Sequence, residues 1–167
     1  GTVMLEGSLL SEGRGTTRPL EMLGAPGLAA QLLIDCMHRL GPQWMMGCTL
    51  RACWFEPTFH KHAGNLCEGV QIHVDRPSGY DHHQFKPWRL ISLVFKALKS
   101  LDANYPLWRE FHYEYEKDRL AIDLINGSSL LREWVEDDKA TTQDMEVLAL
   151  ADEASWLEER RDYLIYD

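Results

Sequence analysis

The residue types best suited to chemistry are concentrated near the amino end of this 167-residue chain. Residues 6–18 contain three glycines, two glutamates, two arginines and four hydroxyl residues, with Leu9 and Leu10 as the apolar exceptions. Glycine permits positive φ and close approach to a ligand, and successive backbone N–H groups can form an anion-binding concavity. We interpret residues 6–18 as a ligand loop. The alternative is a polar connection between a strand at residues 2–5 and a helix that begins near Pro26.

The glycines of this loop do not form a known nucleotide motif. A P-loop requires Gly-x-x-x-x-Gly-Lys-Ser/Thr, and the segment from Gly13 to Arg18 has neither that spacing nor the lysine. A dinucleotide fingerprint would continue into a helix, whereas Pro19 follows Arg18. Both nucleotide-binding motifs are therefore excluded.

A second polar stretch, residues 58–66, has no usable period and is predicted to be a loop. The strand expected at residues 69–75 alternates between an apolar face and a face bearing Gln71 and His73. The histidine and cysteine residues of this region raise the question of a zinc site: His60, His62, Cys67 and His73. Their spacing matches no recognised zinc motif, so we expect no metal.

The composition excludes several functional classes. A formal net charge of -9 would repel a nucleic-acid backbone, so no nucleic-acid partner is expected. No run approaches the roughly 20 apolar residues of a membrane span. The chain contains no C-x-x-C pair; Cys36 is interpreted as a buried hydrophobe, and one disulfide among Cys48, Cys53 and Cys67 is left open.

Hydrophobic periodicity predicts one α+β domain with a small mixed sheet packed by several helices. Helices are expected from Pro26 to Leu40, with Leu32 and Leu33 on the buried face, and from Pro87 to Leu101. A strand is expected at residues 49–55, and residues 105–117 are interpreted as an extended, aromatic-rich wall. A short helix capped by Ser128 and a final helix over residues 141–166, broken near Ala151, complete the prediction.

The sequence resembles the exo-β-N-acetylmuramidase family, long catalogued as a bacterial domain of unknown function. The matching segments follow one another in order along the chain: Glu6-Gly7-Ser8, Ser11-Glu12-Gly13-Arg14-Gly15-Thr16-Thr17-Arg18-Pro19, Phe55-Glu56-Pro57-Thr58-Phe59-His60-Lys61-His62-Ala63-Gly64, Cys67-Glu68-Gly69-Val70-Gln71-Ile72-His73-Val74, Tyr113-Glu114-Tyr115-Glu116 and Asp123-Leu124-Ile125-Asn126-Gly127-Ser128. The resemblance implies that residues 1–167 form the C-terminal domain of a two-domain protein. Its partner would be its own N-terminal Rossmann-like domain, which this chain lacks.

The resemblance also implies an activity, the release of terminal N-acetylmuramic acid from peptidoglycan fragments. Glycosidic cleavage uses a carboxylic acid that protonates the leaving oxygen and normally a second carboxylate. Glu12 is the first catalytic candidate and Glu6 the second. An arginine beside Glu12 would lower its pKa, which opposes the acid role unless Arg14 points elsewhere.

The remaining candidates would bind substrate. Arg14 and Arg18 could hold the lactyl carboxylate of N-acetylmuramic acid bidentately, or could form structural ion pairs. Further polar and aromatic candidates for the cleft are Thr16, Lys61, His62, Gln71, His73, Tyr113 and Tyr115.

Two other readings stay open at this point: a non-catalytic muropeptide-binding or glycan-binding module, and a domain that only braces the Rossmann-like half. No cofactor is expected. The resemblance suggests a periplasmic or secreted protein.

Overall fold

The computed structural model describes residues 1–75 and 79–166, and it confirms the predicted α+β class. Three strands form the sheet: β1 (Met22–Ala25), β2 (Thr49–Phe55) and β3 (Cys67–His73). The helices are α1 (Ala30–Leu40), α2 (Pro87–Leu101), α3 (Ala121–Asn126), α4 (Leu130–Glu136) and α5 (Thr142–Glu159), and three 3-10 helices are η1 (Thr2–Gly7), η2 (Pro42–Met45) and η3 (Arg160–Tyr163). The segment Arg76-Pro77-Ser78-Gly79 has the composition of a turn, and residues 76–78 lie outside the described residues.

The sheet has the order β1-β3-β2, and both pairings are antiparallel. The expectation of a mixed sheet was therefore wrong. Parallel neighbouring strands need a crossover connection, usually a helix, and no helix joins two neighbouring strands of this sheet. Glu68 on β3 ties the sheet to α1, since its Oε1 accepts a hydrogen bond of 2.9 Å from the backbone N–H of Ala30. That contact satisfies one of the free N–H groups in the first turn of α1.

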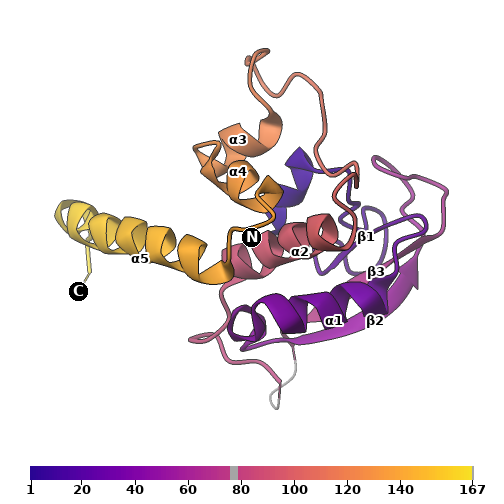
Figure 1. Ribbon diagram of the computed structural model, residues 1–167, viewed down its shortest axis with the longest axis horizontal. Coiled ribbons are helices and arrows are strands. Elements are labelled where there is room, and N and C mark those ends of the chain that lie inside the picture. Colours follow the sequence, from indigo (N-terminus) through magenta and orange to yellow (C-terminus); the bar gives the residue numbers. More distant parts are fainter. Residues whose placement is uncertain (76–78, 167) are drawn as a thin grey trace.

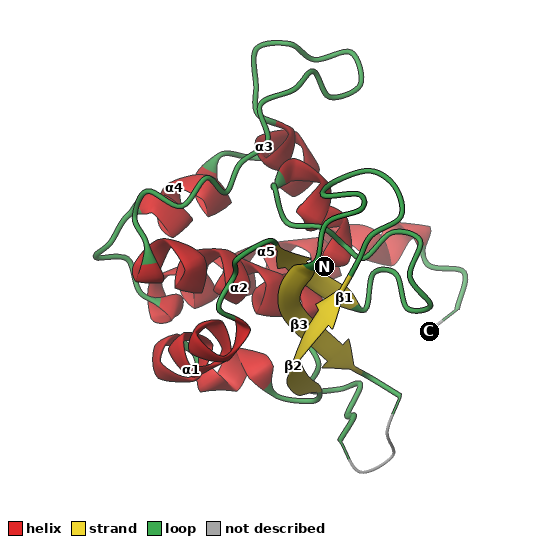
Figure 2. Ribbon diagram, turned by 90° about the vertical axis from the view of Figure 1, so that its right-hand side faces the viewer, coloured by secondary structure: helices red, strands yellow, loops and turns green. Residues whose placement is uncertain are grey.

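Helix α1 packs against β2 and β3, and α2 lies side by side with α1 (Figures 1 and 2). The core comprises apolar side chains of both helices together with Val70 and Ile72 of β3. The sequence predicts an apolar stripe on α2, of which Ile91, Val94, Phe95 and Leu98 are buried, whereas its last member, Leu101, is 44% exposed. In α1 Leu33 is buried, but Leu32 is 59% exposed and does not belong to the core face as predicted. The buried apolar side chains of α1 and α2 belong to one cluster of buried residues.

Several local expectations were wrong. Residues 2–5 belong to η1 rather than to a strand, because both Met4 and Leu5 are buried and no neighbouring strand pairs with them. Residues 105–117 contain only isolated bridges: residues 105–109 pack on the body, with Leu107 buried, and the rest of this long connection between α2 and α3 extends outward (Figure 1). Helix α4 begins at Leu130 without a side-chain cap from Ser128.

Helix α5 begins where the sequence predicts, but it is not broken near Ala151. The capping box is present, since Thr141 accepts from the Asp144 backbone and Asp144 accepts from the Thr141 backbone. The helix then continues without interruption through Ala151 to Glu159. In Figure 1 it projects away from the rest of the domain.

All four cysteines are free thiols, so none of the open disulfide pairings is formed. Burial raises the pKa of the Cys48 thiol to about 11. Among the described residues, no helix has the length and apolar character required to cross a membrane.

Candidate functional site

Glycine geometry shapes the loop that carries Glu12. Gly13 and Gly15 adopt φ values of 68° and 82°, in the left-handed region that glycine enters without strain. A Cβ at Gly15 would lie 1.7 Å from the Thr58 hydroxyl oxygen, so only glycine fits there. The Thr58 backbone N–H also donates to the carbonyl oxygen of Arg14 at 3.0 Å. The two polar loops predicted from the sequence are thus packed against each other.

Glu12 lies at the centre of a cluster of cations. Its side chain is 1% exposed, and its Oε2 lies 2.9 Å from the ammonium of Lys61. This contact is an ion pair and not a well-aligned hydrogen bond, because Oε2 has no partner that meets hydrogen-bond geometry. The Nε of Arg14 donates to Oε1, and the Nδ1 of His60 lies 3.6 Å from the same oxygen. A buried carboxylate is stable here because the cations of Arg14 and Lys61 lie beside it.

Arg14 joins the two candidate carboxylates. Its Nη2 donates to Oε1 of Glu6 at 3.1 Å while its Nε contacts Glu12. On the other side of Glu6, the Tyr113 hydroxyl donates to Oε2 at 3.1 Å. Residues 6, 12, 14 and 113 therefore form one continuous polar network.

The electrostatic balance at Glu12 favours the ionised carboxylate. Burial raises its pKa, but the hydrogen bond from Arg14 and the ion pair with Lys61 outweigh burial, so the pKa lies below its ordinary value. The Glu12 hydrogen bond in turn raises the pKa of Arg14. A general acid needs the opposite shift. The conflict between Arg14 and an acid role, anticipated from the sequence, is present in the structure.

Lys61 and His62 hold the second loop against the first. The Lys61 side chain is 6% exposed, and its ammonium donates to the carbonyl oxygens of Leu5 at 2.6 Å and Ser8 at 3.2 Å. Burial lowers the Lys61 pKa, and Glu12 partly opposes that effect. His62 places Nε2 2.7 Å from the carbonyl oxygen of Leu9. Both side chains contact protein groups at the base of the loop.

His60 and His62 adopt positive φ values of 69° and 59°. Such backbone strain persists in non-glycine residues where surrounding contacts fix the conformation. The contacts of Lys61, between these two residues, provide that constraint. Strained backbone beside a buried carboxylate is a feature of functional sites.

The network opens into a cavity of about 410 Å³. Glu6, Glu12 and Arg14 supply its polar side, and Gly15 lies at its edge. The apolar lining comprises Val3, Pro19, Leu20 and Phe59, and Thr2 lies beside them. Val3, Leu20 and Phe59 are each at least half exposed, so the cavity has a polar base and an open apolar rim.

The apolar rim was not predicted from the sequence. Phe59 is a single aromatic in a polar loop without periodicity, and Val3 was assigned to a strand. The only sequence signal for Phe59 was its position next to His60 and Lys61. Such a rim can contact the apolar C–H face of a sugar or an apolar surface of another domain.

The structure places the other candidates outside this cavity. Thr16 stabilises the glycine turn, since its hydroxyl donates to the Gly13 carbonyl at 2.6 Å. Arg18 lies at the end of β3, where its Nη1 is 2.8 Å from both Glu21 and Asp75. Tyr115 is 98% exposed on the long connection after α2.

Gln71 and His73 do not form the floor of the cavity, contrary to expectation. Gln71 accepts a hydrogen bond of 2.7 Å from Arg51 on the neighbouring strand. His73 is buried, with Nδ1 3.7 Å from Asp75 and no partner for Nε2 among the described residues. Neighbouring residues cover the polar face of β3. The alternation of the sequence therefore predicted correctly that this face is polar, but it did not predict that the face is buried. The described residues also contain no cluster of three or more His, Cys, Asp or Glu arranged to hold a metal.

An open cavity with two carboxylates at its base is an arrangement found in domains that cleave or bind glycans. The chain belongs to the family described as exo-β-N-acetylmuramidase NamZ, C-terminal, which it matches over residues 1–166. It is 37% identical over 120 residues to the peptidoglycan β-N-acetylmuramidase NamZ of Bacillus subtilis (strain 168), covering 72% of this chain and 26% of that protein. The chain therefore spans about a quarter of that relative's length.

A solved structure has a similar fold. A DUF1343 family protein from Bacteroides fragilis aligns with a TM-score of 0.63 at 20% identity, covering 99% of this chain and 39% of that one. Both relatives are much longer, and the family description places the present domain at the C-terminal end.

Proposed function

We propose that this domain forms one wall of the active cleft of an exo-β-N-acetylmuramidase that releases terminal N-acetylmuramic acid from peptidoglycan fragments. A preceding Rossmann-like domain would supply the other wall. The observation that carries the proposal is the Glu6–Arg14–Glu12 network at the base of an open cavity. Thr2 and Val3 line that cavity, so a preceding domain would connect to this one at the rim of the cleft.

Within this site Glu12 acts as an ionised carboxylate. Its lowered pKa suits a group that orients Arg14 and stabilises positive charge, and does not suit a proton donor. Glu6 is 33% exposed and lies on the cavity surface, so it is the carboxylate of this domain that can reach substrate. The second catalytic carboxylate of the pair would come from Glu12 or from the preceding domain.

Arg14 binds the lactyl carboxylate of the muramic acid residue. Its bonds to Glu6 and Glu12 engage Nη2 and Nε, and a guanidinium carries five N–H donors, so others are available to the cavity. Guanidinium and carboxylate pair bidentately, with planar geometry that both partners share. Thr16, Arg18, Lys61, His62, Gln71 and His73 would support the loops and strand around the site, while Tyr113 would hold Glu6 and Tyr115 would extend the wall.

The test is an assay of a chromogenic β-N-acetylmuramide with the full-length protein, this domain alone and the full-length Glu6→Gln and Glu12→Gln variants. We expect turnover by the full-length protein, no turnover by the isolated domain, and a loss of about 100-fold or more in both variants. Full turnover in both variants would remove these carboxylates from the mechanism. Activity of the isolated domain would remove the need for a second wall.

A second candidate is a muropeptide-binding module that performs no chemistry. The observation favouring it is that Glu12 is already engaged by Arg14 and Lys61 and has no raised pKa. This alternative predicts measurable affinity of the isolated domain for N-acetylmuramic acid, and no hydrolysis by the full-length protein.

A further inference from the structure

We propose that the outer part of α5, together with residues 160–166, is a docking arm that packs against the domain preceding this one in the full-length protein. The inference concerns an interface and does not rest on the proposed activity. The outer arm comprises residues 150–166.

The base of α5 is firmly attached to the domain. Arg89, which is 6% exposed, donates from Nε to Glu146 at 2.7 Å and from Nη1 to Glu153 at 2.5 Å. The indole N–H of Trp44 donates to Glu146 at 2.7 Å, and Met145 is buried in the core. Together with the capping box, these contacts fix the direction in which the helix leaves the domain. The outer arm is therefore the continuation of an anchored helix.

Apart from the ion pair between Glu153 and Arg89, the outer arm has almost no cover in this chain. Every described residue from Leu150 onward is exposed. Leu150, Trp156 and Leu157 are each more than half exposed, and Ile165 and Tyr166 are 88% and 84% exposed. Figure 1 shows the helix extending away from the remaining elements. Apolar side chains at this density normally mark an interaction surface.

The apolar residues of α5 lie on two opposite faces. At 100° per residue, Met145 and Trp156 share the face that begins in the core, whereas Val147, Leu150, Ala154 and Leu157 follow a 3-4-3 spacing on the opposite side. A helix packed on one domain needs only one apolar face. The second face, with Val147 58% and Leu157 52% exposed, requires a partner on its other side.

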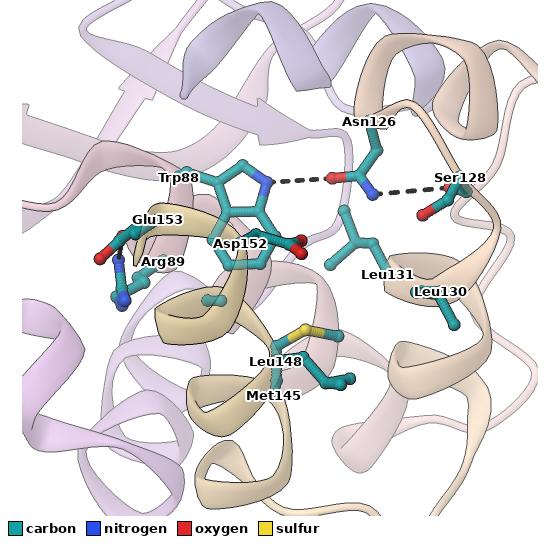
Figure 3. A pocket seen from close by; sticks show the side chains of 11 residues that line it. Trp88, Arg89, Asn126, Ser128, Leu130, Leu131, Met145, Leu148, Asp152 and Glu153 are labelled. Carbon is teal, nitrogen blue, oxygen red and sulfur yellow. Dashed lines mark hydrogen bonds and ion pairs between the residues drawn. The ribbon is translucent and has the colours of Figure 1, made fainter. Parts of the chain in front are cut away.

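The packing beneath α5 is also incomplete. A hollow of about 290 Å³ lies between α5 and the elements α2, α3 and α4 (Figure 3). Trp88, Leu130, Leu131 and Leu148 supply much of its apolar lining, and Asp152 and Glu153 lie at its margin. Leu148 is 47% exposed although it faces the hollow. An apolar side chain from a partner would complete this packing.

The chain path and charge favour the preceding domain as the occupant. A Cβ at Gly1 would lie 2.4 Å from the Pro87 carbonyl oxygen, so the first residue packs against the α2 turn that also carries Trp88 and Arg89. In the longer proteins of this family, a preceding domain would thus enter beside the base of α5. Residues 142–166 contain seven carboxylates and two arginines, a net charge of -5. Such a surface would repel a second copy of itself, so the complementary surface is apolar with a basic rim.

Hydrogen exchange tests the proposal. We expect the amides of residues 150–159 to exchange about tenfold or more slowly in the full-length protein than in the isolated 167-residue domain. In the full-length protein, a Leu150→Glu, Leu157→Glu double substitution should restore rapid exchange. The matched control is Ser155→Glu, which adds a charge to the same helix away from the 3-4-3 face and should retain protection.

Equal exchange of residues 150–159 in the two proteins would overturn the proposal. A second result would also overturn it: the full-length protein dimerises with increasing concentration, the Leu150→Glu, Leu157→Glu variant abolishes the dimer, and Ser155→Glu preserves it. The occupant of the outer arm would then be a second copy of the protein. All of these variants change exposed positions, and thermal unfolding of the isolated domain verifies that the core is unaffected.

Discussion

The ammonium of Lys61 lies 2.9 Å from Oε2 of Glu12, and both side chains are almost completely removed from solvent. The same ammonium contacts the carbonyl oxygens of Leu5 and Ser8. One side chain from the second polar loop therefore fixes the conformation of the first. This arrangement makes the carboxylate at the cavity base part of the structure as well as a candidate for function.

Removing both members of this pair should cost less than the sum of the losses from removing each one alone. Glu12→Gln leaves Lys61 buried without its counter-charge, and Lys61→Met leaves Glu12 with Arg14 alone. We expect each single variant to lose about 3–5 kcal/mol of unfolding free energy, and the double variant to lose clearly less than the sum. Urea unfolding of the four proteins measures the coupling. Strict additivity would show that the two side chains do not interact.

The Glu12 pKa gives the pair a defined pH dependence. Because the folded-state pKa is lowered, ionised Glu12 stabilises the protein above the unfolded carboxylate pKa of about 4.3, and that stabilisation disappears as the pH falls through the folded-state value. The difference in unfolding free energy between the wild type and Glu12→Gln should thus be largest near neutral pH and shrink on acidification. A difference that stays constant from neutral pH to pH 2 would contradict the assigned direction of the shift.

Gly15 provides a test of the contact between the two loops. Gly15 and Gly64 both have positive φ, 82° and 72°, but a Cβ would collide with Thr58 only at Gly15 and would meet nothing within 4 Å at Gly64. Gly64→Ala should cost about 1 kcal/mol for the backbone conformation alone. Gly15→Ala should cost at least about 1 kcal/mol more, because Thr58 must move. Equal losses in chemical unfolding would show that the loops are not in close contact.

Part of this architecture was predictable because strong periodicity reflects burial. The apolar stripe of α2 and the alternation of β3 identified both elements, and the capping box located the start of α5. The 3-10 helix at residues 2–7 could not be distinguished from a short strand, since a few apolar residues fit both periods. The continuity of α5 past Ala151 was hidden by its two apolar faces.

The candidate site was predicted only in part, for a related reason. Glycine and charge density identified residues 6–18, and the structure brings Glu6, Glu12 and Arg14 together there. The covering of Gln71 and His73 depends on Arg51 and Asp75 from other segments, and a single strand pattern contains no information about such neighbours. Tertiary contacts decide which polar side chains reach a cavity.

The most direct test of the central claim is the substrate discrimination of Arg14 variants in the full-length protein. Matched chromogenic β-N-acetylmuramide and β-N-acetylglucosaminide substrates differ by the lactyl carboxylate that Arg14 is proposed to bind. Arg14→Ala should reduce kcat/KM for the muramide by about 10- to 100-fold, which corresponds to the loss of a charge-assisted hydrogen-bond pair, and reduce the glucosaminide rate less. Arg14→Lys should recover part of the discrimination. An equal reduction for both substrates, or none for either, would contradict the assignment of this cavity as the muramic acid site.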